Sequence, residues 1–252
     1  QTGRMLIRIE KELIKVKPDL TLVPGDTNSA LAGALASVKL KIPVAHLEAG
    51  VRSYDFYMPE EINRRLVDQV SELLFAPTEN AVRNLLSEGM AKERVHLTGD
   101  IMYDTLLQNI SLANKKTHVL KELGLNPGER YVVLTLHRER NVDDASNLRS
   151  VLEALPKINA RVNFPVHPRT EKNINKFKLR EVVDNIQNLI LTEPLGYLEF
   201  LSLLYHCSLV LTDSGGVQKE AFLLKKPCIT LRERTEWIET VELGANVLVG
   251  AN

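Results

Sequence analysis

The chain has 252 residues, of which 44% are hydrophobic and 25% charged, and its 32 Lys and Arg residues balance 32 Asp and Glu residues. At about 150 residues per domain, this length predicts one or two domains with a large core and excludes a small fold held by disulfides. A formal charge of zero provides no broad footprint for nucleic acid or an anionic membrane, so neither is an expected partner.

Short apolar runs alternate with amphipathic stretches, the pattern of parallel strands joined by helical crossovers. Met5, Ile9 and Leu13 have helical spacing at the start of the chain. Strands are then predicted, in chain order, at 20–23, 42–47, 73–75, 95–97, 131–136, 162–166, 189–191, 209–211 and 228–231. Helices are predicted at 29–38, 60–70, 79–86, 147–155, 197–205 and 217–224.

A polar stretch at 114–130, which ends in Asn-Pro-Gly, is the predicted domain boundary. We therefore expect two α/β lobes, residues 1–118 and 119–252, whose strands point their carboxyl ends toward a shared crevice. No run approaches the roughly 20 apolar residues of a membrane span, and the start lacks an apolar signal segment. These features predict a cytoplasmic protein without a membrane partner.

Acidic residues follow the strands of the first lobe. Asp26 comes directly after a predicted strand, where it either caps the next helix or presents a carboxylate to the crevice. Glu48 also follows a strand, and Gly50 allows the backbone to turn sharply. Glu60 and Glu61 stand at a predicted helix start, which suits the helix dipole. Carboxylates that share one cavity also suit proton transfer, because repulsion and burial raise a pKa toward neutrality.

In the second lobe, His137 and Arg138 end a predicted strand, where they suit a phosphate or sugar hydroxyl, although a structural histidine is an equal alternative. The sequence Ser-Gly-Gly at 214–216 separates a strand from a helix, and the free N–H groups of that helix start favour an anion such as a diphosphate. The alternative is a glycine-rich turn without a ligand. Glu220, about one turn later, is placed to accept hydrogen bonds from ribose hydroxyls.

Several common sites are missing from the sequence. No P-loop or G-x-G-x-x-G fingerprint is present, and no Cys/His cluster has zinc spacing. The chain also lacks a G-x-S-x-G elbow and a basic, aromatic array for single-stranded nucleic acid. Kinase, dehydrogenase, zinc-enzyme and serine-hydrolase functions lose their main support, and we expect neither a metal nor another cofactor.

Seven motifs together resemble the non-hydrolysing UDP-N-acetylglucosamine 2-epimerase family. They are PGDT at 24–27, HLEAGVRS at 46–53, PEEINR at 59–64, APTEN at 76–80, TGD at 98–100, HRE at 137–139 and TDSGGVQKEA at 212–221. They occur in family order over nearly the whole chain. The resemblance implies two Rossmann-like lobes of the GT-B type with a central cleft, and a homodimer that converts UDP-N-acetylglucosamine to UDP-N-acetylmannosamine without a redox cofactor.

The resemblance also implies roles for individual residues. The catalytic matches are Asp26, Glu48, Glu60 and His137, and the diphosphate matches are Ser214, Gly215 and Gly216. Glu220 matches a ribose contact, Phe200 a uracil neighbour, Arg52 and Arg138 further substrate neighbours, and His167 a histidine near a second, activating substrate site. The family begins with a strand and a Gly-Thr-Arg-Pro-Glu-like loop that have no counterpart here. We therefore expect that strands of the first lobe are missing and that the native protein is longer.

Three alternatives remain open at this point. A hydrolysing 2-epimerase would release free N-acetylmannosamine, but its relatives tend toward Gly-Gly-Glu where this chain has Glu48-Ala49-Gly50. A GT-B glycosyltransferase would use the same nucleotide site, yet it gives no reason for three acids in the first lobe. A sugar-nucleotide-binding module without catalysis would bind UDP and exchange no hydrogen at carbon 2.

Overall fold

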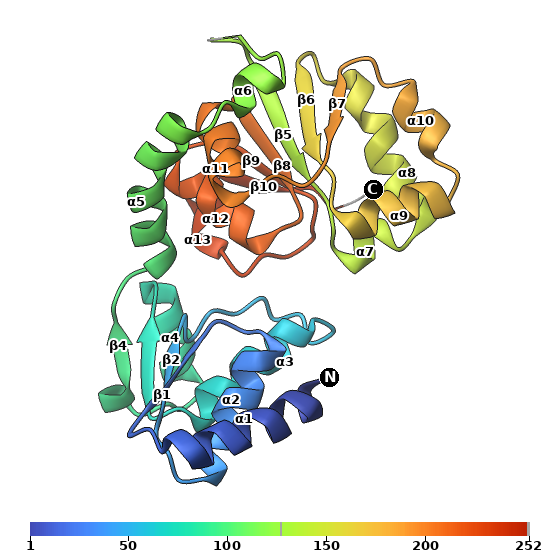
Figure 1. The fold of residues 1–252 in the computed structure, drawn as a ribbon. Coiled ribbons are helices and arrows are strands. Elements are labelled where there is room, and N and C mark those ends of the chain that lie inside the picture. Colours follow the sequence, from blue (N-terminus) through green and yellow to red (C-terminus); the bar gives the residue numbers. More distant parts are fainter. Residues whose placement is uncertain (127, 251–252) are drawn as a thin grey trace. The chain divides into compact units, whose positions relative to one another are not determined.

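The structure, a computed structural model, describes residues 1–126 and 128–250. It divides into two compact units, Gln1–Ile101 and Met102–Asn252, each built around its own parallel sheet (Figure 1). All nine predicted strands are present, with small differences at their ends. Both units are therefore α/β, as the alternation of apolar runs and amphipathic stretches predicts.

The first unit has four parallel strands in the order β1-β2-β3-β4. Small side chains of α2, among them Ala30 and Ala34, let this helix approach the sheet closely, where it shares a core with Val23, Val44 and Val67. The elements in chain order are α1 (Thr2–Val16), β1 (Thr21–Pro24), α2 (Asn28–Lys39), β2 (Val44–Leu47), α3 (Pro59–Val70), β3 (Leu73–Ala76), α4 (Glu79–Ser87), the 3-10 helix η1 (Lys92–Arg94) and β4 (Val95–Leu97).

The second unit has six parallel strands in the order β10-β9-β8-β5-β6-β7. Strands β8 and β5 are neighbours although they are distant in sequence. In chain order the elements are α5 (Ile101–Lys116), α6 (Val119–Glu122), β5 (Tyr131–Thr135), α7 (Glu139–Val142), α8 (Ala145–Ala154), the 3-10 helix η2 (Leu155–Lys157), β6 (Arg161–Pro165), α9 (Pro168–Lys176), α10 (Arg180–Asp184), β7 (Leu189–Thr192), α11 (Tyr197–His206), β8 (Leu209–Thr212), α12 (Gly215–Leu223), β9 (Cys228–Thr230), α13 (Ile238–Glu242) and β10 (Asn246–Leu248).

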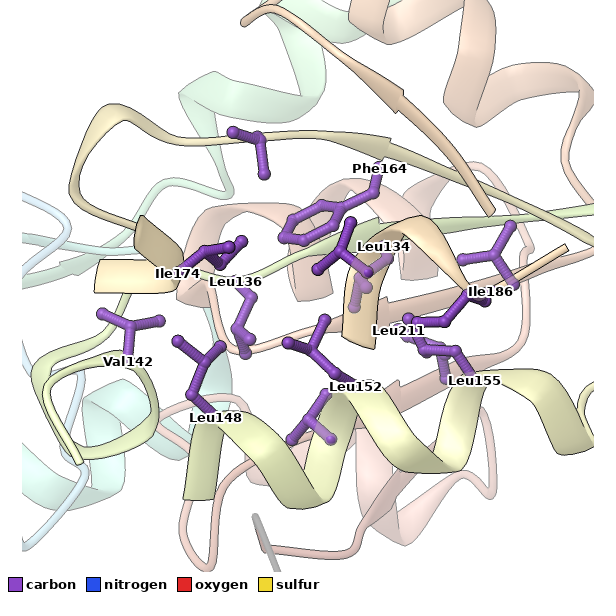
Figure 2. Packing of buried hydrophobic residues seen from close by; sticks show 14 of the residues in the cluster. Leu134, Leu136, Val142, Leu148, Leu152, Leu155, Phe164, Ile174, Ile186 and Leu211 are labelled. Carbon is purple, nitrogen blue, oxygen red and sulfur yellow. The ribbon is translucent and has the colours of Figure 1, made fainter. Parts of the chain in front are cut away.

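Apolar side chains cover both faces of the second sheet, as parallel strands require. Along β5, Val132 and Leu134 join one buried cluster, whereas Tyr131 and Val133 join another. Figure 2 shows how Leu134 and Phe164 lie over Leu152 of α8 in the first of these clusters.

Helix α5 packs with the second unit. Its buried residues Leu106 and Ala113 contact Leu201 of α11. The division of the chain therefore lies at the start of α5, whereas the predicted boundary after residue 118 placed the whole of this helix in the first lobe. An amphipathic helix packs on the core that buries its apolar side chains. The polar residues that follow α5 do not indicate which of the two units provides that core. Residue 127 of the predicted boundary stretch lies outside the described residues.

In the part of the chain that the structure describes, no helix combines the length and apolar character needed to cross a bilayer. The two cysteines are free and buried, Cys207 directly after α11 and Cys228 in β9. Burial raises the pKa of the Cys228 thiol to about 11.

Candidate functional site

Two acid-bearing turns meet at the carboxyl edge of the first sheet. Asp26 follows β1 and Glu48 follows the neighbouring β2, and the Gly25 N–H donates to the Leu47 carbonyl at 3.0 Å. Glu48 adopts a φ of 64°, which is rare for a residue with a side chain. The Glu48 carboxylate lies so close to Gly25 that a Cβ there would be 3.4 Å from its Oε2 atom. The two predicted acids are thus brought together by adjacent turns.

Helix α3 packs against the Asp26 turn. The Asn63 side-chain amide donates to the Asp26 carbonyl at 2.9 Å and to the Asn28 side chain at 3.1 Å. The Arg64 guanidinium forms an ion pair with the Asp26 carboxylate. Glu60 precedes Asn63 and Arg64 by three and four residues, so it lies on the same face of the helix. All three predicted carboxylates therefore belong to one edge of the first unit.

The two neighbouring glutamates of α3 have different environments. Glu61 is fully buried and accepts hydrogen bonds from the Ser53 N–H at 2.8 Å, the Ser53 hydroxyl at 3.0 Å and the Arg65 Nε at 2.8 Å. Burial alone would raise the pKa of Glu61, but the Ser53 and Arg65 hydrogen bonds outweigh it and lower the pKa. Glu61 is therefore a structural anchor, whereas Glu60 is half-buried and more accessible.

The buried carboxylate of Asp68 links the two acid-bearing turns through hydrogen bonds. The Asp68 carboxylate of α3 lies 2.6 Å from the His46 Nδ1 and 2.7 Å from the Arg52 Nη2, and it accepts a hydrogen bond from the Gly50 N–H at 3.1 Å. The other ring nitrogen of His46 lies 2.9 Å from the Gly25 carbonyl. A carbonyl only accepts, so Nε2 carries a proton, and a second proton lies between Nδ1 and the carboxylate. Asp68 thus holds the turn after Glu48 directly, through Gly50, and the turn that carries Asp26 indirectly, through the contact of His46 with Gly25.

Arg52 has a different environment from the one predicted. Its side chain has no exposed surface, and its donors contact Asp68, the Val51 carbonyl at 2.8 Å and both carboxylate oxygens of Glu88 at 2.9 and 2.7 Å. Burial works to lower the pKa of Arg52, but the ion pairs with Glu88 and Asp68 raise it. In this structure Arg52 is buried and holds the turn that follows Glu48 through these contacts, and its role as a substrate neighbour stays a prediction.

The second unit places His137 beside a buried acid that the sequence reasoning missed. Strands β5 and β8 are paired, with Thr135 opposite Thr212, so His137 and Asp213 emerge at the same edge. The His137 Nδ1 lies 3.2 Å from the Asp213 carboxylate, and the Arg138 N–H donates to it at 2.8 Å. His137 is 34% exposed, whereas Asp213 is fully buried.

His167 lies next to His137, with ring centroids 5.4 Å apart. It stands at the start of α9, where its Nδ1 accepts the Arg169 N–H at 3.1 Å. Burial lowers the pKa of His167, and nearby His137 and Arg169 lower it further. The predicted activating-site histidine and the predicted catalytic histidine are therefore neighbours in one unit.

The turn at 214–216 begins α12. The Ser214 hydroxyl accepts the Val217 N–H at 3.4 Å and caps the helix. A Cβ on Gly215 would lie 2.0 Å from Oε1 of Glu236, so close approach of this buried carboxylate requires glycine. At Gly216, no atom would lie closer than 4.0 Å to a Cβ. Of the two glycines, only Gly215 is therefore required by the close packing of a neighbouring side chain.

The predicted nucleoside contacts lie on α11 and α12. Glu220 is buried, and this burial raises its pKa despite a hydrogen bond from the Tyr197 hydroxyl and the nearby Lys219 ammonium. Phe200 is half-buried and packs against the core of the second unit. Across the described residues, no group of three or more His, Cys, Asp or Glu side chains is arranged to hold a metal ion.

Three charged residues of these networks were not singled out from the sequence. Asp213 lay within the TDSGGVQKEA motif, and its place directly after a strand was an available signal. Arg64 ended the PEEINR motif, but only the packing of α3 on β1 reveals its ion pair with Asp26. Asp68 sits in the middle of a helix, where nothing local distinguishes it from a solvated acid.

All 252 residues match the family described as UDP-N-acetylglucosamine 2-epimerase. The chain belongs to this family. It is 51% identical over 253 residues to a UDP-N-acetylglucosamine 2-epimerase homolog of Methanococcus maripaludis, and the match covers the whole chain and 70% of that relative. It is 49% identical to the UDP-2,3-diacetamido-2,3-dideoxy-D-glucuronate 2-epimerase of Pseudomonas aeruginosa, covering 99% of the chain and 69% of the relative.

The fold agrees with the family. A crystal structure of Methanocaldococcus jannaschii UDP-GlcNAc 2-epimerase in complex with UDP-GlcNAc and UDP superposes with a TM-score of 0.93 at 50% identity, covering the whole chain and 70% of that protein. The predicted GT-B composition of two Rossmann-like units is confirmed. The chain spans about 70% of the length of these relatives.

The Asp68 network generates a stability prediction. Asp68→Asn leaves one acceptor oxygen for three donors and removes the negative charge beside the buried His46 and Arg52, so we expect a loss of about 3 kcal/mol or more. Urea denaturation followed by circular dichroism measures it. Asp19→Asn, at an exposed position of the same unit, is the control and should leave the midpoint nearly unchanged. Equal midpoints for the two variants would contradict a stabilising role for Asp68.

Glu61 generates a prediction about pH. Because the folded-state pKa of Glu61 is below its ordinary 4.5, its carboxylate stabilises the fold fully above that value and loses this contribution as the pH falls. The difference in unfolding free energy between wild type and Glu61→Gln should therefore shrink as the pH is lowered from 7 to below 4.5. Denaturation curves at several pH values test this, and a constant difference would count against the assignment.

Proposed function

We propose that this chain interconverts UDP-N-acetylglucosamine and UDP-N-acetylmannosamine without net hydrolysis. The observation that carries the proposal is the convergence of Asp26, Glu48 and the Glu60 face of α3 at one edge of the first sheet. A fold alone does not require three acids there. Identity of about half to epimerases of this family supports the same conclusion.

The proposed reaction proceeds by elimination and re-addition. A carboxylate removes the proton from carbon 2, the bond between carbon 1 and oxygen breaks, and its electron pair leaves with the diphosphate, which gives UDP and 2-acetamidoglucal. A proton then arrives at carbon 2 on the opposite face while a diphosphate oxygen bonds carbon 1 again. Removal from one face and delivery to the other require more than one positioned acid or base, which explains a set of carboxylates.

The second unit would bind the UDP portion. The start of α12 at Ser214 and Gly216 offers backbone donors for the diphosphate, and Glu220 and Phe200 are the candidates for ribose and uracil. His137 and Arg138 would stabilise the negative charge that develops on the leaving diphosphate. We expect the active protein to be a homodimer, as the family resemblance implies.

A second substrate deserves the same test. The Pseudomonas aeruginosa relative named for UDP-2,3-diacetamido-2,3-dideoxy-D-glucuronate is 49% identical, nearly the same as the 50% shared with the Methanocaldococcus jannaschii UDP-N-acetylglucosamine 2-epimerase. Both named sugars carry an acetamido group at carbon 2, so the same chemistry applies to either. The two substrates differ at carbons 3 and 6, and comparing kcat/KM for both distinguishes them.

The decisive experiment is proton NMR of the protein with UDP-N-acetylglucosamine in deuterium oxide. We expect UDP-N-acetylmannosamine to appear with deuterium at carbon 2 and no free sugar to accumulate. Free N-acetylmannosamine would favour the hydrolysing reaction. Tight UDP binding without deuterium incorporation would favour a binding module, and a requirement for a sugar acceptor would favour a glycosyltransferase.

The acids generate a matched pair of variants. Glu60→Gln should lower kcat by about 100-fold or more, the usual contribution of a positioned acid or base, with UDP affinity and thermal stability retained. Glu61→Gln, one residue away, should instead lower stability. Asp26→Asn and Glu48→Gln should lower kcat as Glu60→Gln does, and Asp26→Asn should also lower stability because it weakens the ion pair of the nearly buried Arg64. Steady-state kinetics with calorimetric UDP titration measures both properties, and equal losses of turnover and affinity would argue against catalytic roles.

The candidate nucleotide site generates a prediction about UDP binding. Ser214→Ala and Glu220→Ala should each weaken UDP binding by roughly tenfold or more, the effect of losing a hydrogen bond that involves a charged partner or ligand. Ser214 also caps α12, so Thr78→Ala, which removes the matching cap of α4, controls for the loss of a helix cap. UDP affinity that is unchanged in the first two variants would remove these residues from the site.

A further inference from the structure

Asp213 gathers donors from one short segment. The His137 N–H lies 3.1 and 3.0 Å from its two oxygens, and the Arg138 N–H donates at 2.8 Å. The Asn141 side-chain amide donates to the same carboxylate at 3.1 Å and to the Leu231 carbonyl at 2.9 Å. The fifth contact is the His137 imidazole, whose Nδ1 is 3.2 Å away. The buried carboxylate thus holds both the backbone and the ring of His137.

The contact between Asp213 and the His137 ring determines which ring nitrogen carries a proton. Burial alone would raise the pKa of Asp213, but hydrogen bonds from the His137 ring and from backbone N–H groups outweigh it and lower the pKa. An ionised carboxylate only accepts hydrogen bonds. The Nδ1 atom that faces it must therefore carry a proton, which leaves Nε2 as the ring nitrogen that is available to a ligand.

His167 restricts the same ring from another side. The two imidazoles lie 5.4 Å apart with an angle of 35° between their planes. The His167 ring is itself held, because its Nδ1 caps α9 by accepting the Arg169 N–H. Rotation of His137 would therefore break the contact with Asp213 and disturb its packing against a fixed neighbour.

We propose that Asp213 is a positioning residue that keeps His137 in its Nδ1–H form and makes Nε2 the atom that meets a diphosphate oxygen. This role rests on the proposed function. When His137 is doubly protonated, Nε2–H donates a charge-assisted hydrogen bond to the phosphate, and the buried carboxylate balances the charge of the imidazolium. When the ring is neutral, Nε2 is an acceptor that can take up a proton again.

The tautomer can be measured without substrate. Long-range proton–nitrogen NMR of the nucleotide-free protein distinguishes the two neutral forms, and His137→Gln identifies the signal by its loss among the six histidines. We expect the neutral ring to be protonated at Nδ1. A neutral ring protonated at Nε2 would overturn the proposal even if the protein proves to be an epimerase. An Nδ1–H ring in a protein without epimerase activity would refute the proposed function alone.

Two variants separate positioning from local structure. In Asp213→Asn the amide N–H₂ competes to face the ring, so we expect the Nδ1–H preference to disappear and kcat to fall by about 100-fold, with UDP affinity changed less than threefold. Asn141→Ala removes another donor to the same carboxylate and should retain the Nδ1–H ring. Wild-type turnover in a folded Asp213→Asn protein would overturn the proposal. If this variant does not fold, the wild-type tautomer decides the question.

Discussion

Both units depend on a buried aspartate that binds a histidine ring and the backbone of a turn after a strand. In the first unit Asp68 contacts the His46 Nδ1 and the Gly50 N–H. In the second, Asp213 contacts the His137 Nδ1 and the N–H groups of His137 and Arg138. A carboxylate has several acceptor positions and no donor, so it can join groups that water would otherwise solvate separately. Each aspartate therefore stabilises a turn from within the protein.

Burial distinguishes structural charges from candidate reactive ones. Asp68, Glu61 and Arg52 have no exposed side-chain surface, and each has several charged or polar protein partners. Asp26 pairs with the nearly buried Arg64, and His137 contacts the buried Asp213. Both nevertheless keep about a third of their side-chain surface exposed. Pairing buried charges offsets their desolvation only where the geometry is good. Networks of this kind hold the exposed groups in place and leave them accessible to a ligand.

The comparisons and the geometry bear on different parts of the function. Family membership follows from similarity over the whole chain, whereas the division of labour among the acids is argued from contacts such as those that distinguish Glu60 from Glu61. The chain is about equally similar to relatives named for two different sugars. The choice between these sugars therefore depends on the protein groups that contact carbons 3 and 6. The carbon 2 chemistry and the substrate preference are therefore separate questions with separate tests.

Hydrophobic periodicity by itself determined the two α/β units and nine of the strands, because buried parallel strands are continuous apolar runs. The strand β10 at Asn246–Leu248, which begins with a polar residue, was not predicted. The motifs also placed Asp26, Glu48 and His137 after strands. Only the tertiary structure decided that α5 joins the second core, that Arg52 is buried and that Asp213 faces His137. Those contacts depend on which strands and helices become neighbours, and β8 lies beside β5 although more than 70 residues separate Thr135 from Thr212.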